Sequence, residues 1–331
     1  MGHRDGRALP GLRRGPLHHR PDHPAQRRGG DAVIGLPLPP PRAGRPASPE
    51  LLERRRAVRR ATPPPGEVRW KAEEFGGVAG IAVDPGDPPA DDSAGPPIVH
   101  LHGGGYRLGG AEGWVGLAHR MARATGRRVI VPEYRLAPEH PFPAALHDAA
   151  AVWQAVADPA QGPPPVLSGD SAGGGLAVAL ALALRSAAAA ESPAVPGPHR
   201  LVLLSPLLDL RADAPSYRLN AERDRLWGRS AAREAAEGYL QGVPPEAEPL
   251  ASPLLADPAA LAGLPPVLLF AGTGEALIDD ATGFARRAAR AQVAVEAHFL
   301  PELPHVWPLL LPDDPRSAEA MARVADFLGL S

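Results

Sequence analysis

Short runs of apolar residues alternate with longer helical patterns over most of this chain. Strands that are buried on both faces of a parallel sheet read as nearly continuous apolar runs, so the alternation predicts an α/β fold. We expect a mostly parallel central sheet with helices on both faces. The expected strands are Val78–Val83, Ile98–Leu101, Val129–Val131, Val166–Ser168, Leu201–Leu204, Val267–Phe270 and Val295–Leu300, and the expected helices are Gly113–Ala124, Ala144–Val156, Ala172–Ala190, Ala281–Ala291 and Ser317–Leu328.

Two stretches lie outside this alternation. Residues 1–47 combine nine arginines with three aspartates and a proline-rich run, and they lack helical or strand periodicity. We expect a disordered extension or a wrongly assigned start there, with a basic tail for an acidic partner as the alternative. The α/β domain then spans residues 48–331 and begins with a helix that Ser48 caps. Residues 211–249 are rich in Ala, Glu and Arg and have no strand-like run, which indicates a helical insertion.

Composition excludes several classes of protein. The 35 basic and 37 acidic residues give a net charge of −2, so no overall positive field favours nucleic acid. The absence of cysteine excludes disulfides, thiolate metal sites and a cysteine nucleophile. The longest apolar run, Leu176–Leu184, is much shorter than the roughly 18 residues of a membrane span. No apolar segment of a signal peptide follows Arg13-Arg14. We therefore expect a cytoplasmic protein with no nucleic-acid partner and no stable membrane insertion.

Gly169–Gly173 has the pattern G-x-S-x-G. Chance alone produces about 0.14 such matches in a chain of this composition, so the pattern needs structural context. That context is present, because the pentapeptide follows an expected strand and opens an expected helix, as in a nucleophile elbow. Ser171 would then lie at a helix N-terminus, where backbone N–H groups favour negative charge. A phosphate-binding loop is the alternative, but no lysine lies near it.

His102–Gly105 follows the expected strand Ile98–Leu101. Consecutive glycines let backbone N–H groups point into a cavity, which is the arrangement that stabilises the oxyanion of acyl transfer. A flexible glycine turn is the alternative reading. The presence of both motifs after strands, in this chain order, favours a serine hydrolase.

A nucleophilic serine needs a base. Of the three histidines after Ser171, His199 precedes the next strand, and His298 lies within an alternating strand on the sheet surface. His305 lies in a proline-bounded loop after that strand, at the end of the sheet where α/β folds collect active-site residues, so it is the best base.

The base in turn needs an acid that lies between Ser171 and His305 in the chain. Glu275 follows the strand Val267–Phe270 in a glycine turn, and it is the favoured acid. Asp279 and Asp280 lie where the next helix begins, and we expect them to cap it, with Asp279 as the alternative acid.

The sequence resembles the hormone-sensitive-lipase-like esterases, or family IV, of the α/β-hydrolase superfamily. The resemblance covers residues 49–330. It rests on the segments His102–Tyr106, Tyr134–His140, Phe142–Leu146, Gly169–Gly174, Ser252–Leu254, Leu264–Val267 and Pro304-His305.

The resemblance implies roles for particular residues. Ser171 is the nucleophile and His305 the base, and Glu275-Ala276-Leu277 aligns with the Asp-Pro-Leu of many members, so the acid is glutamate here. The amides of Gly104, Gly105 and Ala172 form the oxyanion hole, and His102 makes a structural contact beneath the glycine loop. The Tyr134–Pro138 block is a packing element.

The resemblance also implies a helical cap, formed from residues 48–66 and 211–249. Tyr217, Leu226, Trp227 and Tyr239 either line an apolar acyl pocket or pack cap against core.

The implied activity is that of a serine carboxylesterase that hydrolyses short- to medium-chain acyl esters through an acyl-enzyme. Its partner is a small-molecule ester, and no metal or organic cofactor is implied. Amide, lactone or acetyl substrates for the same triad are the alternative, followed by a non-catalytic ligand-binding protein on this fold. A homodimer is left open.

Overall fold

The structure is a computed structural model, in which residues 36–61, 68–86, 95–159, 162–189 and 195–330 are described. These residues belong to one compact unit. Most of the expected extension, residues 1–35, lies outside the described residues. Residues 36–47 form no helix or strand. They nevertheless contact the domain, since Arg45 N donates to Pro138 O over 3.0 Å and Pro39 O lies 2.8 Å from His147 Nε2.

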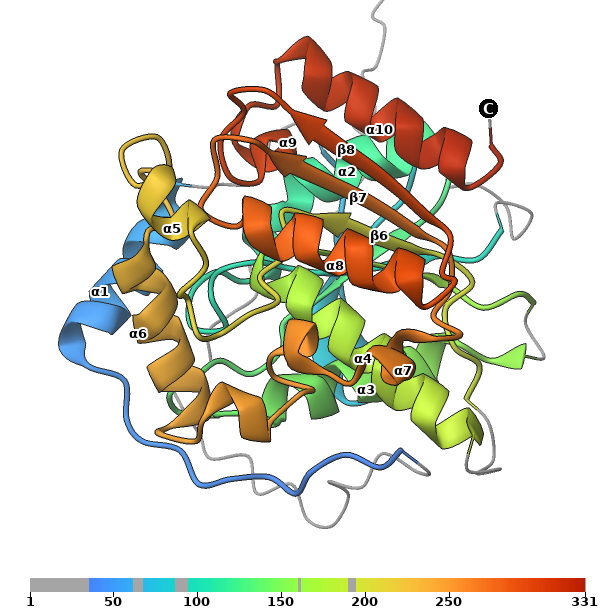
Figure 1. The fold of residues 1–331 in the computed structure, drawn as a ribbon. Helices are drawn as coiled ribbons and strands as arrows, with labels where there is room; N and C mark the ends of the chain where they lie inside the picture. The colour runs from blue at the N-terminus through green and yellow to red at the C-terminus, as the bar shows by residue number, and fades with distance from the viewer. Residues whose placement is uncertain (1–35, 62–67, 87–94, 160–161, 190–194, 331) are drawn as a thin grey trace, which may run out of the picture. The chain divides into compact units, whose positions relative to one another are not determined.

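An eight-stranded sheet runs through the described residues in the order β1-β2-β4-β3-β5-β6-β7-β8 (Figure 1). The strands from β4 through β8 in this order are parallel, whereas β2 pairs antiparallel with both β1 and β4. The predicted mostly parallel sheet is thus confirmed. The strands are β1 Lys71–Phe75, β2 Val78–Val83, β3 Ile98–Leu101, β4 Val129–Pro132, β5 Val166–Asp170, β6 Leu201–Leu204, β7 Val267–Gly272 and β8 Val295–Leu300.

Strand β1 was not expected from the sequence. It lies at one edge of the sheet, and its residues, Lys-Ala-Glu-Glu-Phe, are partly or fully exposed. An exposed edge strand does not need the apolar run that marks the buried strands β3 to β7, so the pattern that finds those strands misses it.

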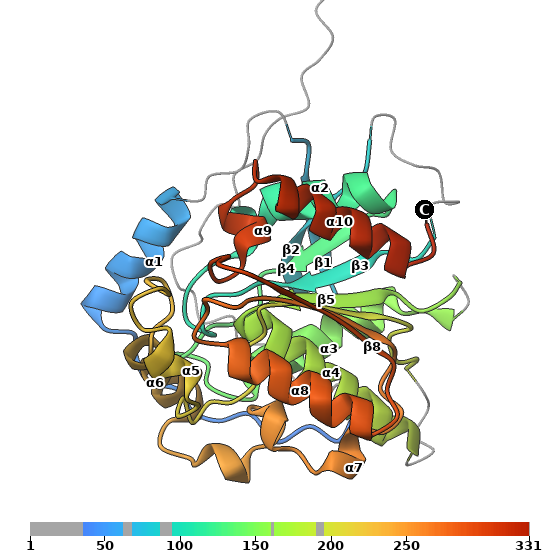
Figure 2. The same cartoon turned by 45° about the horizontal axis from the view of Figure 1, so that its top comes forward.

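Helices cover both faces of the sheet, as predicted. Helices α2 and α10 pack together on one face, and α3, α4 and α8 lie on the other (Figure 2). A 3-10 turn at Ala111–Trp114 forms the start of the expected helix before α2. The helices are α1 Pro49–Ala61, α2 Val115–Thr125, α3 Ala144–Val156, α4 Ala172–Ala189, α5 Ser216–Leu219, α6 Arg229–Leu240, α7 Pro258–Leu261, α8 Ile278–Arg290, α9 Trp307–Leu310 and α10 Pro315–Phe327.

The insertion of residues 211–249 lies beside α1. Its helices are the short α5, the longer α6 and a 3-10 turn at Pro245–Ala247, and loops connect them. The views in Figures 1 and 2 agree that α1, α5 and α6 form one group at the same end of the sheet. An ion pair of 3.1 Å between Arg54 and Glu234 connects α1 to α6. The two segments expected to form a cap are therefore neighbours in space.

Candidate active site

Ser171 occupies a tight turn between β5 and α4. Its φ of 50° lies in the left-handed region, which is strained for a residue with a side chain. The flanking glycines leave room for the turn: a Cβ at Gly169 would lie 2.2 Å from Gly173 O, and a Cβ at Gly173 would lie 1.9 Å from Leu101 O. The strand-turn-helix context expected for Gly169–Gly173 is present.

Ser171, His305 and Glu275 are hydrogen-bonded in series. His305 Nε2 lies 2.9 Å from Ser171 Oγ, and His305 Nδ1 lies 3.0 Å from Glu275 Oε2. The Ser171 and His305 side chains are nearly buried, and Glu275 is fully buried. The structure thus brings together the three residues proposed as nucleophile, base and acid, which follow β5, β8 and β7 respectively.

Ser205 holds the acid and the base loop together. Its Oγ donates to Glu275 Oε1 over 2.7 Å and accepts a hydrogen bond of 3.1 Å from Val306 N. Gly272 N also donates to Glu275 Oε1. Ser205 was not predicted from the sequence, because no motif marks it. It nevertheless follows the expected strand Leu201–Leu204, at the same end of the sheet as the other site residues.

Two opposing effects act on the pKa of His305. Burial lowers the pKa because it disfavours the imidazolium, whereas the hydrogen bond and the negative charge of Glu275 raise it. The net result is a pKa above the ordinary value for histidine. Glu275 therefore stabilises the protonated form of His305.

Asp279 and Asp280 lie in the first turn of α8 but do not cap it, so the expectation of caps was wrong. Asp279 Oδ2 accepts a hydrogen bond of 2.8 Å from Ser216 N. Asp280 Oδ2 accepts from Leu208 N and Asp209 N. Burial raises the pKa of Asp280 to about 8. Asp279 anchors the first residue of α5, Asp280 anchors the loop after β6, and it is Glu275 that meets His305.

The glycine loop after β3 faces the same end of the sheet. Gly104 and Gly105 have φ values of 113° and 62°, and a Cβ at Gly104 would lie 2.3 Å from Leu108 O. Within the described part of the chain, neither glycine amide donates to another protein group. Ala172 is the first residue of α4, where amides have no acceptor within the helix. The three amides named as oxyanion donors are thus free to bind a substrate oxygen.

His102 lies beneath this loop, where the sequence analysis expected a structural contact. Its ring is fully buried and stacks on Tyr134 at a centroid distance of 4.1 Å. His102 Nδ1 lies 2.8 Å from Gly103 O, and Tyr134 OH donates to His102 O over 2.6 Å. Burial lowers the pKa of His102. Burial thus favours the neutral ring, which packs beneath the loop.

Trp227 is one of the residues of the insertion that reach the site. Its ring stacks on His305 at a centroid distance of 6.1 Å, and a Cβ at Gly105 would lie 2.7 Å from its Cη2 atom. Of the other residues considered as pocket lining, Leu226 is exposed and Tyr239 stacks on Tyr106 at 3.8 Å. Asp224 holds Trp227 in place, since its Oδ1 accepts from Trp227 N and its Oδ2 accepts from Ala276 N.

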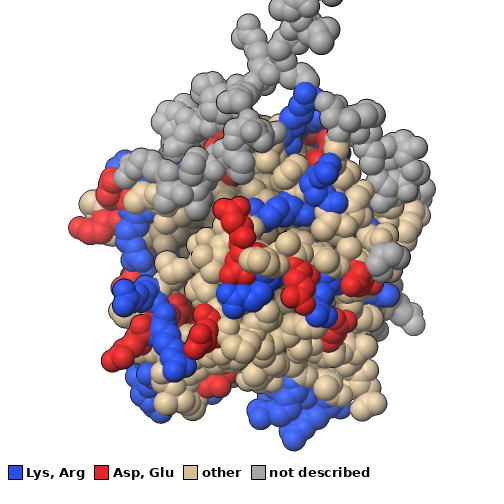
Figure 3. Space-filling model, turned by 90° about the horizontal axis from the view of Figure 1, so that it is seen from above, with Lys and Arg blue, Asp and Glu red and all other residues tan. Residues whose placement is uncertain are grey.

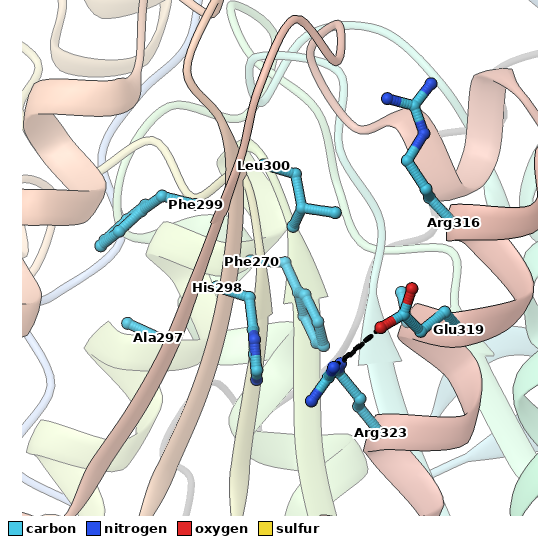
Figure 4. A pocket seen from close by; sticks show the side chains of 9 residues that line it. Phe270, Ala297, His298, Phe299, Leu300, Arg316, Glu319 and Arg323 are labelled. Atoms are coloured by element: carbon cyan, nitrogen blue, oxygen red, sulfur yellow. Dashed lines mark hydrogen bonds and ion pairs between the residues drawn. The ribbon is translucent and has the colours of Figure 1, made fainter.

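His298 lies away from Ser171, on the outer strand β8, as expected. It stacks on Phe270 at 5.1 Å, and its Nε2 lies 2.7 Å from Glu296 Oε1. It lines a hollow of about 290 Å³ between β8 and α10, which the Arg323–Glu319 ion pair also lines (Figure 4). None of Ser171, Glu275 and His305 belongs to this hollow.

Basic and acidic side chains are interspersed on the described part of the face in Figure 3. Among the described residues, no group of three His, Asp or Glu side chains has the arrangement of a metal site. Of the described helices, none combines the length and hydropathy needed to span a bilayer.

Residues 98–309 match a family model described as alpha/beta hydrolase fold. An acetyl-hydrolase of Streptomyces hygroscopicus is 38% identical over 70% of this chain and 74% of its own length. An esterase of Acinetobacter venetianus is 35% identical over 70% of this chain and 73% of its own length. A solved esterase of the bacterial hormone-sensitive lipase family has a TM-score of 0.74 and 35% identity, covering 86% of this chain and 92% of the other.

Proposed function

The chain belongs to the hormone-sensitive-lipase-like esterases of the α/β-hydrolase family, and from this premise we propose how its residues act. It is a serine carboxylesterase. In our proposal Ser171 is the nucleophile, His305 the general base and Glu275 the acid that orients it. One observation carries the assignment: these side chains form a buried hydrogen-bonded series with distances of 2.9 and 3.0 Å.

Acylation begins when His305 Nε2 removes the proton of Ser171 Oγ as this oxygen attacks the ester carbonyl carbon. The carbonyl oxygen becomes an oxyanion, which accepts hydrogen bonds from the amides of Gly104, Gly105 and Ala172. When the tetrahedral intermediate collapses, the bond to the alcohol oxygen breaks and His305 donates its proton to that oxygen. The alcohol leaves, and the acyl group remains on Ser171.

Deacylation repeats these steps with water. His305 removes a proton from water as the water oxygen attacks the acyl carbon, and the same amides bind the new oxyanion. Collapse breaks the bond to Ser171 Oγ, which recovers its proton from His305. Throughout, the Glu275 carboxylate accepts from His305 Nδ1 and stabilises the imidazolium.

We propose that α1 and residues 211–249 form a cap over this site, with residues 62–66 of the first segment outside the described part of the chain. The contacts of Trp227 with both Gly105 and His305 support this role. They also favour short- to medium-chain acyl esters, because the indole ring occupies space beside the reacting groups. The acetyl-hydrolases among the relatives agree with a small acyl group.

The test is hydrolysis of p-nitrophenyl acetate, butyrate and octanoate by the wild type and by Ser171→Ala. We expect the wild type to cleave the shorter esters and to be labelled by a fluorophosphonate, and the variant to do neither. Ser230→Ala, which changes an exposed serine of α6, is the control. Full activity of Ser171→Ala would overturn the assignment. A cytoplasmic location and a homodimer stay predictions from the sequence.

A further inference from the structure

Three hydrogen-bond donors converge on one carboxylate oxygen directly beside the nucleophile. Asp170 precedes Ser171 and is 1% exposed. Its Oδ1 accepts from Gly103 N over 3.0 Å and from Trp114 Nε1 over 2.7 Å, and it lies 3.1 Å from His100 Nε2. A buried carboxylate with several donors makes strong, charge-assisted hydrogen bonds, so this arrangement is rigid.

The donors come from three places around the glycine loop. His100 lies in β3 before the loop, Gly103 lies within it, and Trp114 lies in the turn after it. The carboxylate lies tightly under the loop, because a Cβ at Gly103 would be 2.3 Å from Asp170 Oδ2. A single side chain thus ties the strand before the loop, the start of the loop and the turn after it to the end of β5, directly before Ser171.

His100 extends this arrangement to a second strand. Its Nδ1 lies 3.0 Å from Ser168 Oγ, so a ring that donates to Asp170 through Nε2 accepts from Ser168. Ser168, His100 and Asp170 have the residue types of a catalytic triad. They are nevertheless 0–1% exposed, and Ser168 lies within β5 and not at a turn, so no substrate reaches them. Their role is support.

We propose that Asp170 is a positioning residue that fixes the oxyanion amides of Gly104 and Gly105 relative to Ser171 Oγ. The inference rests on the proposed function of those groups. Oxyanion stabilisation requires donors within about 2.7–3.1 Å of the developing charge, so small displacements of the loop weaken it. The ground-state ester depends much less on these donors. Loss of the Asp170 contacts therefore lowers kcat with little change in KM.

The experiment measures p-nitrophenyl acetate hydrolysis per active site, with sites counted by titration with diethyl p-nitrophenyl phosphate. We expect Asp170→Asn to lose about 10- to 100-fold in kcat, less than the loss of a whole oxyanion donor. Trp114→Phe keeps a ring and removes one donor, and we expect a loss of about 3- to 10-fold. KM changes by less than about threefold in both variants.

Matched controls remove equivalent buried bonds elsewhere. Trp153→Phe loses the hydrogen bond from Trp153 Nε1 to Pro196 O, and Asp148→Asn alters a buried carboxylate bonded to Arg135. We expect both controls to keep kcat per site within about twofold, because neither contacts the glycine loop. They measure how much kcat is lost when a buried polar contact is changed but the oxyanion donors stay in place.

Counting active sites separates a variant that has misfolded from one that folds but holds the oxyanion amides in the wrong place. A value of kcat per site for Trp114→Phe equal to that of Trp153→Phe would overturn the proposal, as would a rise in KM at unchanged kcat. If Asp170→Asn does not fold, Trp114→Phe decides alone. A wild-type protein that is neither titrated nor active would instead overturn the proposed function, so the two failures are distinguishable.

Discussion

The molecule contains two arrays of serine, histidine and carboxylate with the same order of hydrogen bonds. The outer array is Ser171–His305–Glu275, and the inner array is Ser168–His100–Asp170. Their heavy-atom distances are similar, between 2.9 and 3.1 Å. The ring nitrogens are exchanged, however, because the serine lies against Nε2 in the outer array and against Nδ1 in the inner one. Heavy-atom distance alone therefore does not distinguish the two arrays.

The two arrays differ in where the backbone places them. The outer residues follow the ends of β5, β7 and β8, and Ser171 has a left-handed backbone that projects its hydroxyl from a turn. The inner residues lie within β3 and β5, at the paired positions His100 and Ser168 and at the end of β5. The glycine loop follows β3 at the end of the sheet where Ser171 lies, and in the described part of the chain the amides of Gly104 and Gly105 donate to no protein group. The two arrays therefore differ in whether a substrate can reach the serine and in whether oxyanion donors are available, and not in the residue types of the triad.

The largest expected difference between the two arrays is in kcat when each serine is replaced by alanine. Ser171→Ala removes the nucleophile, so we expect kcat for p-nitrophenyl acetate to fall by on the order of 10⁴-fold or more. Ser168→Ala removes a hydroxyl that contacts Asp170 only through His100, and we expect a loss of kcat below about tenfold. Equal losses in kcat per titrated site would mean that the inner array takes part in the chemistry.

The next test concerns the acid of the outer array. Glu275→Gln keeps the shape but loses the charge that orients and stabilises the imidazolium, so we expect kcat to fall by about 10²–10⁴-fold. Asp279→Asn is the control, because Asp279 bonds to Ser216 N and not to His305. A large loss of kcat in Asp279→Asn together with an active Glu275→Gln would reassign the acid.

The two alanine substitutions should affect stability in the opposite order to kcat, so that Ser168→Ala destabilises the protein more than Ser171→Ala. Ser168→Ala leaves the buried His100 Nδ1 without its partner, which costs about 1–3 kcal/mol in the free energy of unfolding. Ser171→Ala also removes the partner of a histidine nitrogen, His305 Nε2, but this atom lies where the substrate is proposed to bind. Water can replace the hydroxyl there, so we expect a change within about 1 kcal/mol. Urea unfolding of both variants measures the difference. A greater loss of stability in Ser171→Ala would contradict the structural role of the inner array.

The sequence predicts the outer array better than the inner one for a physical reason. Active-site residues of a parallel sheet follow its strands, so a motif such as His102–Gly105 or Gly169–Gly173 is visible beside an apolar run. His100 lies inside such a run, and its partner Ser168 depends on the pairing of β3 with β5, which no local pattern specifies. The roles of Asp279 and Asp280 are hidden for the same reason, because their partners, Ser216 in α5 and Leu208 in the loop after β6, are distant in sequence.

The smallest test uses pH to compare the two acids. His305 acts as a base only when it is neutral, so kcat/KM rises about tenfold per pH unit below its pKa and levels off above it. Because Glu275 raises the pKa of His305 above 6.5, the midpoint of the acid limb of the wild type lies above that value. Glu275→Gln removes this charge, and the limb moves to lower pH.

Asp170 also raises the pKa of His305, but more weakly than Glu275, so Asp170→Asn moves the limb in the same direction by less. Profiles of kcat/KM from pH 5 to 9 measure both shifts, and a larger shift in Asp170→Asn than in Glu275→Gln would mean that the inner carboxylate dominates the field at the base.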